Sequence, residues 1–155
     1  MRRRDREITD RAELLRVLDG CDTLRVAFQG EEYPYVVPLS FGWAEESGGQ
    51  VVLYVHGAKT GLRHALLARC PRVAVEADRM LGYAATAHGL TCAYESIMGT
   101  GEARVVTGEE ARCGLAALVR HCGFDGYDCG EQVMAATSVW KITLRTLTGK
   151  RRTVD

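Results

Sequence analysis

Hydrophobic positions near the start of the chain repeat with helical spacing. Leu14, Val17 and Leu18 fall on one helical face, and Asp10 stands before them at the position of an N-cap. An acidic side chain at that position accepts hydrogen bonds from the free amides of the first turn. The pattern predicts a helix over about 10–19.

Alternation of apolar and polar positions then predicts strands. The stretch 24–29 alternates with period two, and 33–43 continues to place large apolar side chains on one face. The opposite face of 33–43 is small and contains two prolines, which cannot donate ladder hydrogen bonds; it consists of Pro34, Val36, Pro38, Ser40 and Gly42. We expect one strand here, bulged or at a sheet edge, whose free carbonyls and open space suit a flat ligand.

The rest of the chain adds strands and short helices in an order without βαβ units. A polar turn joins 33–43 to an apolar strand at 51–56, whereas 80–93, rich in Ala, Gly and Thr, shows no clear period. Further strands are expected at 73–77, 96–106 and 140–145, and helices at 62–69 capped by Thr60, at 107–122 opened by a capping box at Thr107, and at 131–136. About six strands with a few flanking helices predict an α+β fold, a six-stranded antiparallel β-barrel.

Composition places this pattern in one globular domain over residues 1–155. Hydrophobic residues make up 46% and charged residues 26%, and 20 Lys and Arg balance 20 Asp and Glu. Without net charge, and without aromatic residues among the basic residues at the chain ends, the sequence does not favour a nucleic-acid partner. It lacks an apolar stretch of membrane-spanning length and the apolar segment of a secretory signal, so we expect a cytoplasmic protein with no membrane partner.

The cysteines show no pattern of shared chemistry. There are six of them, at positions 21, 70, 92, 113, 122 and 129. None forms a C-x-x-C pair, and their spacing to the histidines matches no zinc signature. We expect free thiols and no metal site.

The turn after the strand with His56 carries the most informative chemistry. A glycine-containing segment, 57–61, leads from that strand into a predicted helix. The amides of 58–62, the dipole of the helix, Lys59 and Arg63 form a pattern that suits a phosphate. The spacing is not that of a Walker loop. A solvated basic helix start explains the same residues about equally well. Taken alone, His56 is better explained as a strand-end histidine bonded to a backbone carbonyl.

Three blocks of sequence resemble a known family. PYVVPLSFG at 34–42, LYVHGA at 53–58 and YESIMGTG at 94–101 are similar to the nitroimidazole-resistance proteins, which belong to the FMN-binding split barrels related to pyridoxamine 5'-phosphate oxidase. RDREI at 4–8 and LTGKR at 147–151 are similar as well. The resemblance therefore covers nearly the whole chain.

This resemblance implies a homodimer of six-stranded split barrels with FMN in each of two interfacial grooves. The isoalloxazine would be lined by Val37, Pro38, Leu39 and Ser40, and the phosphate end would meet Gly57, Ala58, Lys59, Leu62 and Arg63. His56 would stand beside the flavin, Ser96 would close the site, and Trp140 would reach across the dimer interface. The relatives place two basic residues together after the turn glycine, whereas here Leu62 precedes Arg63, which implies a weaker hold on the phosphate.

Three hypotheses about function follow. The first is an FMN-dependent reductase of small flat acceptors such as nitroimidazoles, with His56 as the catalytic residue that supplies a proton near neutral pH. The second is a non-catalytic binding or sensing module for flavin, deazaflavin or haem, in which His56 is a haem ligand or a packing contact. The third is an interaction protein whose groove is filled by side chains; the small, proline-containing face of 36–42 argues against it.

Overall fold

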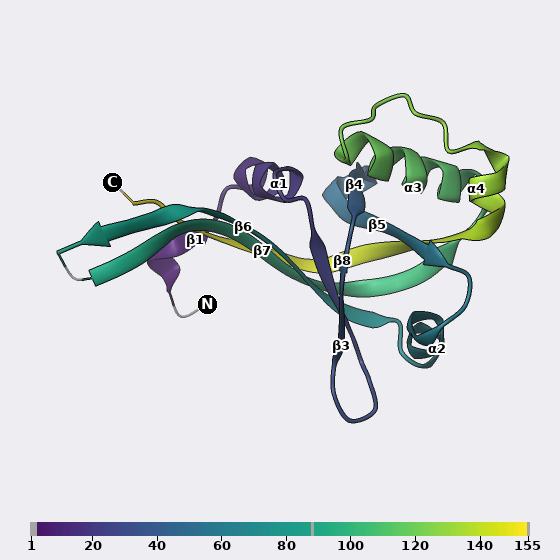
Figure 1. The fold of residues 1–155 in the computed structure, drawn as a ribbon, viewed down its shortest axis with the longest axis horizontal. Helices are drawn as coiled ribbons and strands as arrows, with labels where there is room; N and C mark the ends of the chain where they lie inside the picture. Colours follow the sequence, from purple (N-terminus) through teal and green to yellow (C-terminus); the bar gives the residue numbers. More distant parts are fainter. Residues whose placement is uncertain (1–2, 88, 155) are drawn as a thin grey trace.

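The computed structural model describes residues 3–87 and 89–154. Helices and strands follow one another in the order shown in Figure 1. The strands are β1 (Glu7–Ile8), β2 (Leu24–Phe28), β3 (Tyr35–Leu39), β4 (Phe41–Glu46), β5 (Gln50–Ala58), β6 (Arg72–Thr86), β7 (Gly89–Val106) and β8 (Thr137–Arg152). The helices are α1 (Arg11–Asp19), α2 (Leu62–Arg69), α3 (Gly108–His121) and α4 (Gly130–Ala136), with 3₁₀ turns at Arg4–Arg6 and Ser47–Gly49.

All strands belong to one antiparallel sheet that is forced to curl. The sheet has the order β3-β2-β6-β7-β8-β5-β4, and β1 pairs with β8. Its two end strands, β3 and β4, are consecutive in the chain and are separated only by Ser40. A single residue cannot bridge the width of a flat sheet of this size, because neighbouring strands lie about 4.8 Å apart. The sheet therefore closes on itself, and the predicted α+β barrel is confirmed.

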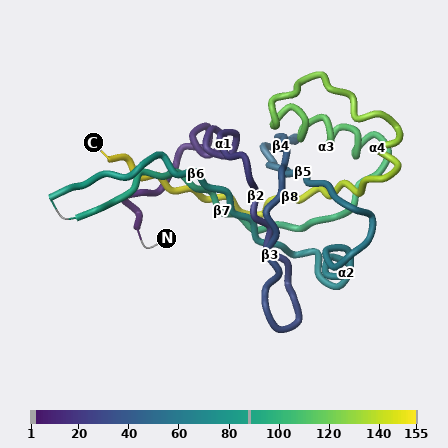
Figure 2. The backbone as a smooth tube through the Cα atoms, viewed as in Figure 1, coloured from purple at the N-terminus to yellow at the C-terminus, as the bar shows by residue number. Residues whose placement is uncertain are grey.

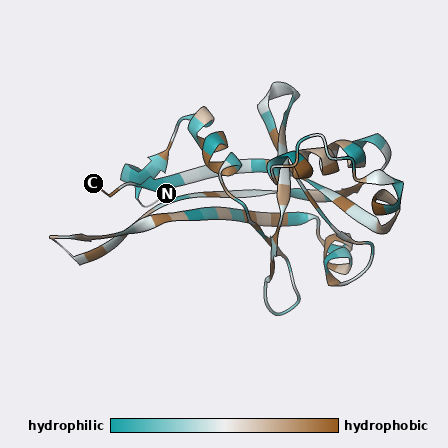
Figure 3. Cartoon of the chain, turned by 45° about the horizontal axis from the view of Figure 1, so that its top comes forward, coloured by the Kyte–Doolittle hydropathy of each residue, from teal (hydrophilic) through white to brown (hydrophobic). Residues whose placement is uncertain are grey.

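Apolar side chains fill the inside of this barrel. Figure 3 shows hydrophobic and hydrophilic residues alternating along the strands, as expected where one face is covered. The main cluster joins side chains from α1, α2 and most strands, and its largest fully buried members are Trp140, Phe41, Leu18, Leu24, Leu53, Ile97 and Ile142. A second cluster lies between α3 and the outer face of β5 and β8 and includes Val52, Tyr54, Leu115 and Val139.

Three helix starts differ in how their amides are capped. Asp10 caps α1 as predicted, its carboxylate accepting the N–H of Glu13 at 2.9 Å. For α2 the bounds are those predicted, but the cap is Gly61 rather than Thr60. Gly61 has φ +117°, a conformation that suits glycine, and no described side chain caps the helix. Thr107 likewise precedes α3 without a side-chain cap bond among the described residues.

The sheet has eight strands, two more than expected. The predicted strand 33–43 is divided at Ser40 into β3 and β4, which lie at opposite ends of the sheet order. The other addition is the two-residue β1. The segment 80–93 lacked a clear period but forms the far ends of β6 and β7, paired as a long hairpin. Figure 2 shows this hairpin running away from the barrel; we call its outer part, residues 80–94, the arm.

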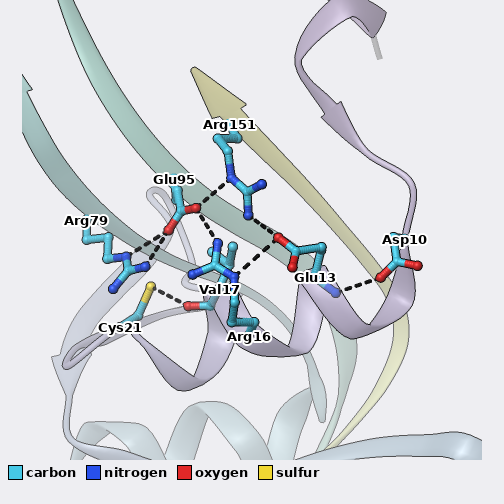
Figure 4. Close-up of polar contacts among 8 residues, drawn as sticks. All are labelled: Asp10, Glu13, Arg16, Val17, Cys21, Arg79, Glu95 and Arg151. Carbon is cyan, nitrogen blue, oxygen red and sulfur yellow. Dashed lines mark hydrogen bonds and ion pairs between the residues drawn. The ribbon is translucent and has the colours of Figure 1, made fainter. Parts of the chain in front are cut away.

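A buried carboxylate ties the base of the arm to α1 (Figure 4). Glu95 is 3% exposed and accepts hydrogen bonds from Arg16 at 2.5 Å, Arg79 at 2.6 Å and Arg151 at 2.6 Å. Arg16 and Arg151 also bind Glu13. Burial works to raise the pKa of Glu95, but the hydrogen bonds from the arginines outweigh it and lower that pKa to about 2.

Replacing Glu95 should therefore reduce stability in a pH-dependent way. The lowered pKa contributes stability that is present above 4.5 and is lost as the pH falls toward about 2. We expect Glu95→Gln to cost roughly 3 kcal/mol at pH 7, measured by urea denaturation, and the deficit to shrink in acid. Glu76→Gln removes a partner of the exposed Arg25 and should cost less than about 1 kcal/mol. Equal losses in the two variants at pH 7 would contradict this account.

Candidate functional site

The end of β5 lies beside the junction of β3 and β4. The last residue pair between β4 and β5 is Phe41 with Val55, so the same register continues to Ser40 beside His56. Both of these residues are exposed. Two residues that the sequence placed in one site are thus brought together by closure of the barrel.

The outer face of β3 is open, as the small side chains predicted. Val36, Pro38 and Ser40 are exposed, whereas Val37 and Leu39 are half-buried and pack against the main core cluster. Of the residues expected to line a flavin ring, Pro38 and Ser40 present side chains outward. Val37 and Leu39 contribute only backbone to the outer face. β3 pairs with β2 alone among the described strands, so its other edge leaves backbone groups free.

The turn from β5 into α2 concentrates positive charge. No Asp or Glu occurs between 47 and 75 in the sequence. Lys59 is exposed, and neither it nor Arg63 has an ion-pair partner within the described part of the chain. The uncapped first amides of α2 add hydrogen-bond donors to the same turn. Positive charge and free amide donors of this kind suit an anion.

Arg63 does not extend into solvent beside Lys59. Its guanidinium carbon lies 4.9 Å from the ring centre of Trp140, within range of a cation–π interaction. The ring of His64 lies 4.7 Å from that of Trp140, and His64 Nε2 is 3.1 Å from the carbonyl oxygen of Ala58. The beginning of α2 is therefore fixed onto β8 through Trp140.

Trp140 belongs to the interior of its own chain. It is 2% exposed and, together with Arg63, lines a small cavity whose other walls are Phe28, Val55, Leu67, Ala103 and Ile142. Its own core and α2 enclose the indole, whereas the resemblance implied that Trp140 reaches across a dimer interface. Its contacts with Arg63 and His64 connect it to the β5–α2 turn.

His56 is the titratable group at the centre of this arrangement. Burial by surrounding atoms and then the positive charge of Arg63 lower the pKa of its imidazole. The lowered pKa favours the neutral ring at neutral pH, with one nitrogen that donates and one that accepts a hydrogen bond. Such a group can hold or release a proton beside a bound ligand.

Ser96 is not near His56 within one chain. On β8, His56 faces Val139 while Ser96 faces Lys150. The stretch of β8 from Val139 to Lys150 is roughly 35 Å long, and it separates His56 from Ser96. Ser96 lies at the base of the arm, next to Glu95, so it closes this site only if a second subunit supplies it.

Sequence reasoning missed two residues of this region. One is His64 of α2, whose ring contacts Trp140. Nothing in the sequence distinguished His64 from an ordinary histidine on a helix. Glu95 lies between Ala93 and Ile97 on the same buried face of β7. A charged residue within such an apolar alternation indicates a buried, partnered carboxylate, and this signal was available in the sequence.

The family of the chain follows from a sequence comparison. A family model described as pyridoxamine 5'-phosphate oxidase matches residues 10–151. The chain belongs to the pyridoxamine 5'-phosphate oxidase family. A search of curated proteins found no significant match.

Solved structures share this family fold. A protein described as a candidate 5-nitroimidazole antibiotic resistance protein from Bacteroides thetaiotaomicron has a TM-score of 0.82 at 24% identity, over 94% of this chain and 86% of that chain. The FAD and heme binding protein from Mycobacterium smegmatis has a TM-score of 0.80 at 22% identity, over 96% and 74%. The flavocytochrome Anf3 from Azotobacter vinelandii has a TM-score of 0.75 at 20% identity, over 99% and 72%. At these identities the similarity establishes the fold, the split barrel.

Within the described residues, no helix of this family member is long and apolar enough to cross a membrane.

Proposed function

We propose that the protein binds FMN at the junction of β3, β5 and α2 and acts as a flavin-dependent reductase of small flat acceptors such as nitroimidazoles. The observation that carries the proposal is the unpaired positive charge of Lys59 and Arg63 at an uncapped helix start, beside the open face of β3. The family membership and the flavin-binding neighbours support it.

The residues at this junction suit both the phosphate and the ring of FMN. A phosphate needs cations and amide donors, and the β5–α2 turn offers both without a competing carboxylate between 47 and 75. A flat ring needs space and a few polar groups, which the exposed Pro38 and Ser40 and the free edge of β3 provide. Bound FMN would supply the electron-transfer chemistry.

The protein's own contribution is to position the ligand and handle a proton. Lys59 and the α2 amides hold the phosphate, which fixes the orientation of the ring relative to β3. His56, next to Ser40, stands where it can donate a proton to a reduced acceptor. Its lowered pKa leaves most of the imidazole neutral near pH 7, so proton donation depends on the protonated fraction, which increases as the pH falls.

Charge reversal at the turn tests this proposal. We expect Lys59→Glu/Arg63→Glu to weaken FMN binding at least about tenfold in calorimetry, because two charge-assisted contacts become repulsive. Arg112→Glu/Arg145→Glu makes the same change of charge at exposed residues elsewhere and should leave binding unchanged. With NADH as reductant, FMN-loaded wild-type protein should reduce a nitroimidazole faster than the same amount of free FMN. Unaltered FMN affinity in the reversed variant would refute the binding site, and no turnover above free FMN would refute the reductase.

A haem- or deazaflavin-binding module is the second candidate. It is favoured by the exposed imidazole of His56 with its lowered pKa, which leaves a neutral nitrogen available as a ligand, and by the haem-binding neighbours. The absorption spectrum of the purified protein separates the candidates. A haem band that disappears in His56→Ala would replace the reductase proposal with this one.

We also propose that the protein is a homodimer in which the arm contacts a second copy. Tyr83 and Leu90 are 77% and 85% exposed and lie on one face of the arm, because Tyr83 pairs with Cys92 and Leu90 with Ala85. Exposed apolar side chains gathered on a projecting hairpin are typical of an interface. A second subunit would also bring a Ser96 toward the site, which one chain alone does not.

Substitutions in the arm test the dimer. We expect sedimentation equilibrium to give twice the chain mass for the wild type, and the mass of one chain for Tyr83→Arg/Leu90→Arg, because two buried charges without partners oppose association. The matched control Tyr127→Arg/Phe124→Arg alters exposed aromatic residues outside the arm and should remain dimeric. A monomeric wild type, or a dimer unaffected by the arm substitutions, would contradict the proposal.

A further inference from the structure

Two buried nitrogen atoms near the proposed phosphate site lack partners. Arg63 Nη1 and Trp140 Nε1 are enclosed and have no hydrogen-bond acceptor among the described residues. Both residues line the same cavity, about 10 Å³ in volume, whose other walls are apolar. A buried donor without an acceptor costs free energy, and more so when it carries charge. The inward position of the Arg63 guanidinium is therefore one that an external acceptor can compete with.

The inward position depends on glycine at residue 57. A Cβ atom on Gly57 would lie 2.0 Å from Arg63 Nη2 and 2.9 Å from Cζ. The three nearest atoms all belong to the Arg63 guanidinium, the flexible end of a long side chain. The φ angle of Gly57 is not positive, so its backbone conformation is one that alanine can adopt. A methyl group there displaces the guanidinium without disturbing the core.

The outward position offers what the cavity lacks. Arg63 is the second residue of α2, in the turn that has free amides and the exposed Lys59. A phosphoryl group held by that turn presents oxygen atoms that a guanidinium can bind in pairs. A ligand without the phosphate offers the Arg63 guanidinium no contact that replaces its contact with the ring of Trp140.

We propose that Arg63 is a two-position residue that makes the site selective for phosphorylated ligands. In the free protein its guanidinium lies on Trp140; when a phosphomonoester binds, the guanidinium turns outward to the phosphate and uncovers the indole. This inference rests on the proposed function, since it needs a phosphorylated ligand at the β5–α2 turn. In addition, the positive charge of Arg63 becomes available to a ligand only when a phosphate replaces its contact with Trp140.

Acrylamide quenching of Trp140 fluorescence tests the movement. The variant Trp43→Phe leaves Trp140 as the one tryptophan. The hydrogen bond that it removes joins Trp43 to Asp19 of α1, and not to α2. The probe is ribose 5-phosphate, which does not absorb in the tryptophan region, with ribose as its unphosphorylated control. We expect saturating ribose 5-phosphate to increase the quenching constant, and ribose to leave it unchanged.

Gly57→Ala and Lys59→Gln separate the position of Arg63 from phosphate binding. Gly57→Ala should show, without ligand, the quenching constant of the ligand-saturated protein, and ribose 5-phosphate should not raise it further. Lys59→Gln should keep the low quenching of the free protein and need a higher concentration of ribose 5-phosphate to raise it. Wild-type quenching in Gly57→Ala would overturn the proposal.

Calorimetry in parallel distinguishes failure of this inference from failure of the proposed function. Heat of binding for FMN and ribose 5-phosphate with no change in Trp140 quenching would mean that Arg63 stays inside, and the two-position proposal alone would fall. Binding of FMN but not of ribose 5-phosphate would also remove it. No heat with either ligand would overturn both proposals.

Discussion

Ser40 connects the two ends of the sheet, and this one-residue connection determines the geometry of the whole molecule. β3 pairs with β2 and β4 pairs with β5, yet both flank the same residue. The sheet can satisfy both sets of backbone hydrogen bonds only by curving until its ends meet. Closure encloses the main core cluster and places the open face of β3 beside the end of β5. The candidate site is a consequence of that junction.

Charge is distributed in two contrasting ways around this barrel. At the base of the arm, the buried carboxylate of Glu95 accepts hydrogen bonds from three partly exposed arginines, Arg16, Arg79 and Arg151. At the β5–α2 turn, Lys59 and Arg63 have no carboxylate partner among the described residues. The first arrangement stabilises the fold. The second leaves positive charge and amide donors free for a ligand. It also leaves Arg63 Nη1 enclosed without a hydrogen-bond partner, which costs folding free energy.

The sequence predicted elements whose causes are local. Asp10 as a cap, the bounds of α2 and the strand that contains His56 all follow from neighbouring residues. The break at Ser40 was not predictable from alternation, because Leu39 and Phe41 keep the same period on either side of it while belonging to opposite ends of the sheet. The arm was missed because most of its described residues are exposed, so they follow no apolar period.

The site was predictable only in part, for the same reason. His56, Lys59 and the α2 amides are close in sequence and were identified together. The inward position of Arg63 depends on the absence of a side chain at Gly57 and on Trp140 from β8, a contact that only the folded chain creates. Ser96 was assigned to the site by resemblance, but its position along β8 separates it from His56 in one chain.

Recognition of a phosphate by the β5–α2 turn can be measured as the ratio of the dissociation constants of riboflavin and FMN. The two ligands share the ring and differ in the phosphate, so quenching of flavin fluorescence during titration isolates that contact. If the turn binds the phosphate, riboflavin should bind about 10- to 100-fold more weakly than FMN. Equal affinities would contradict this binding.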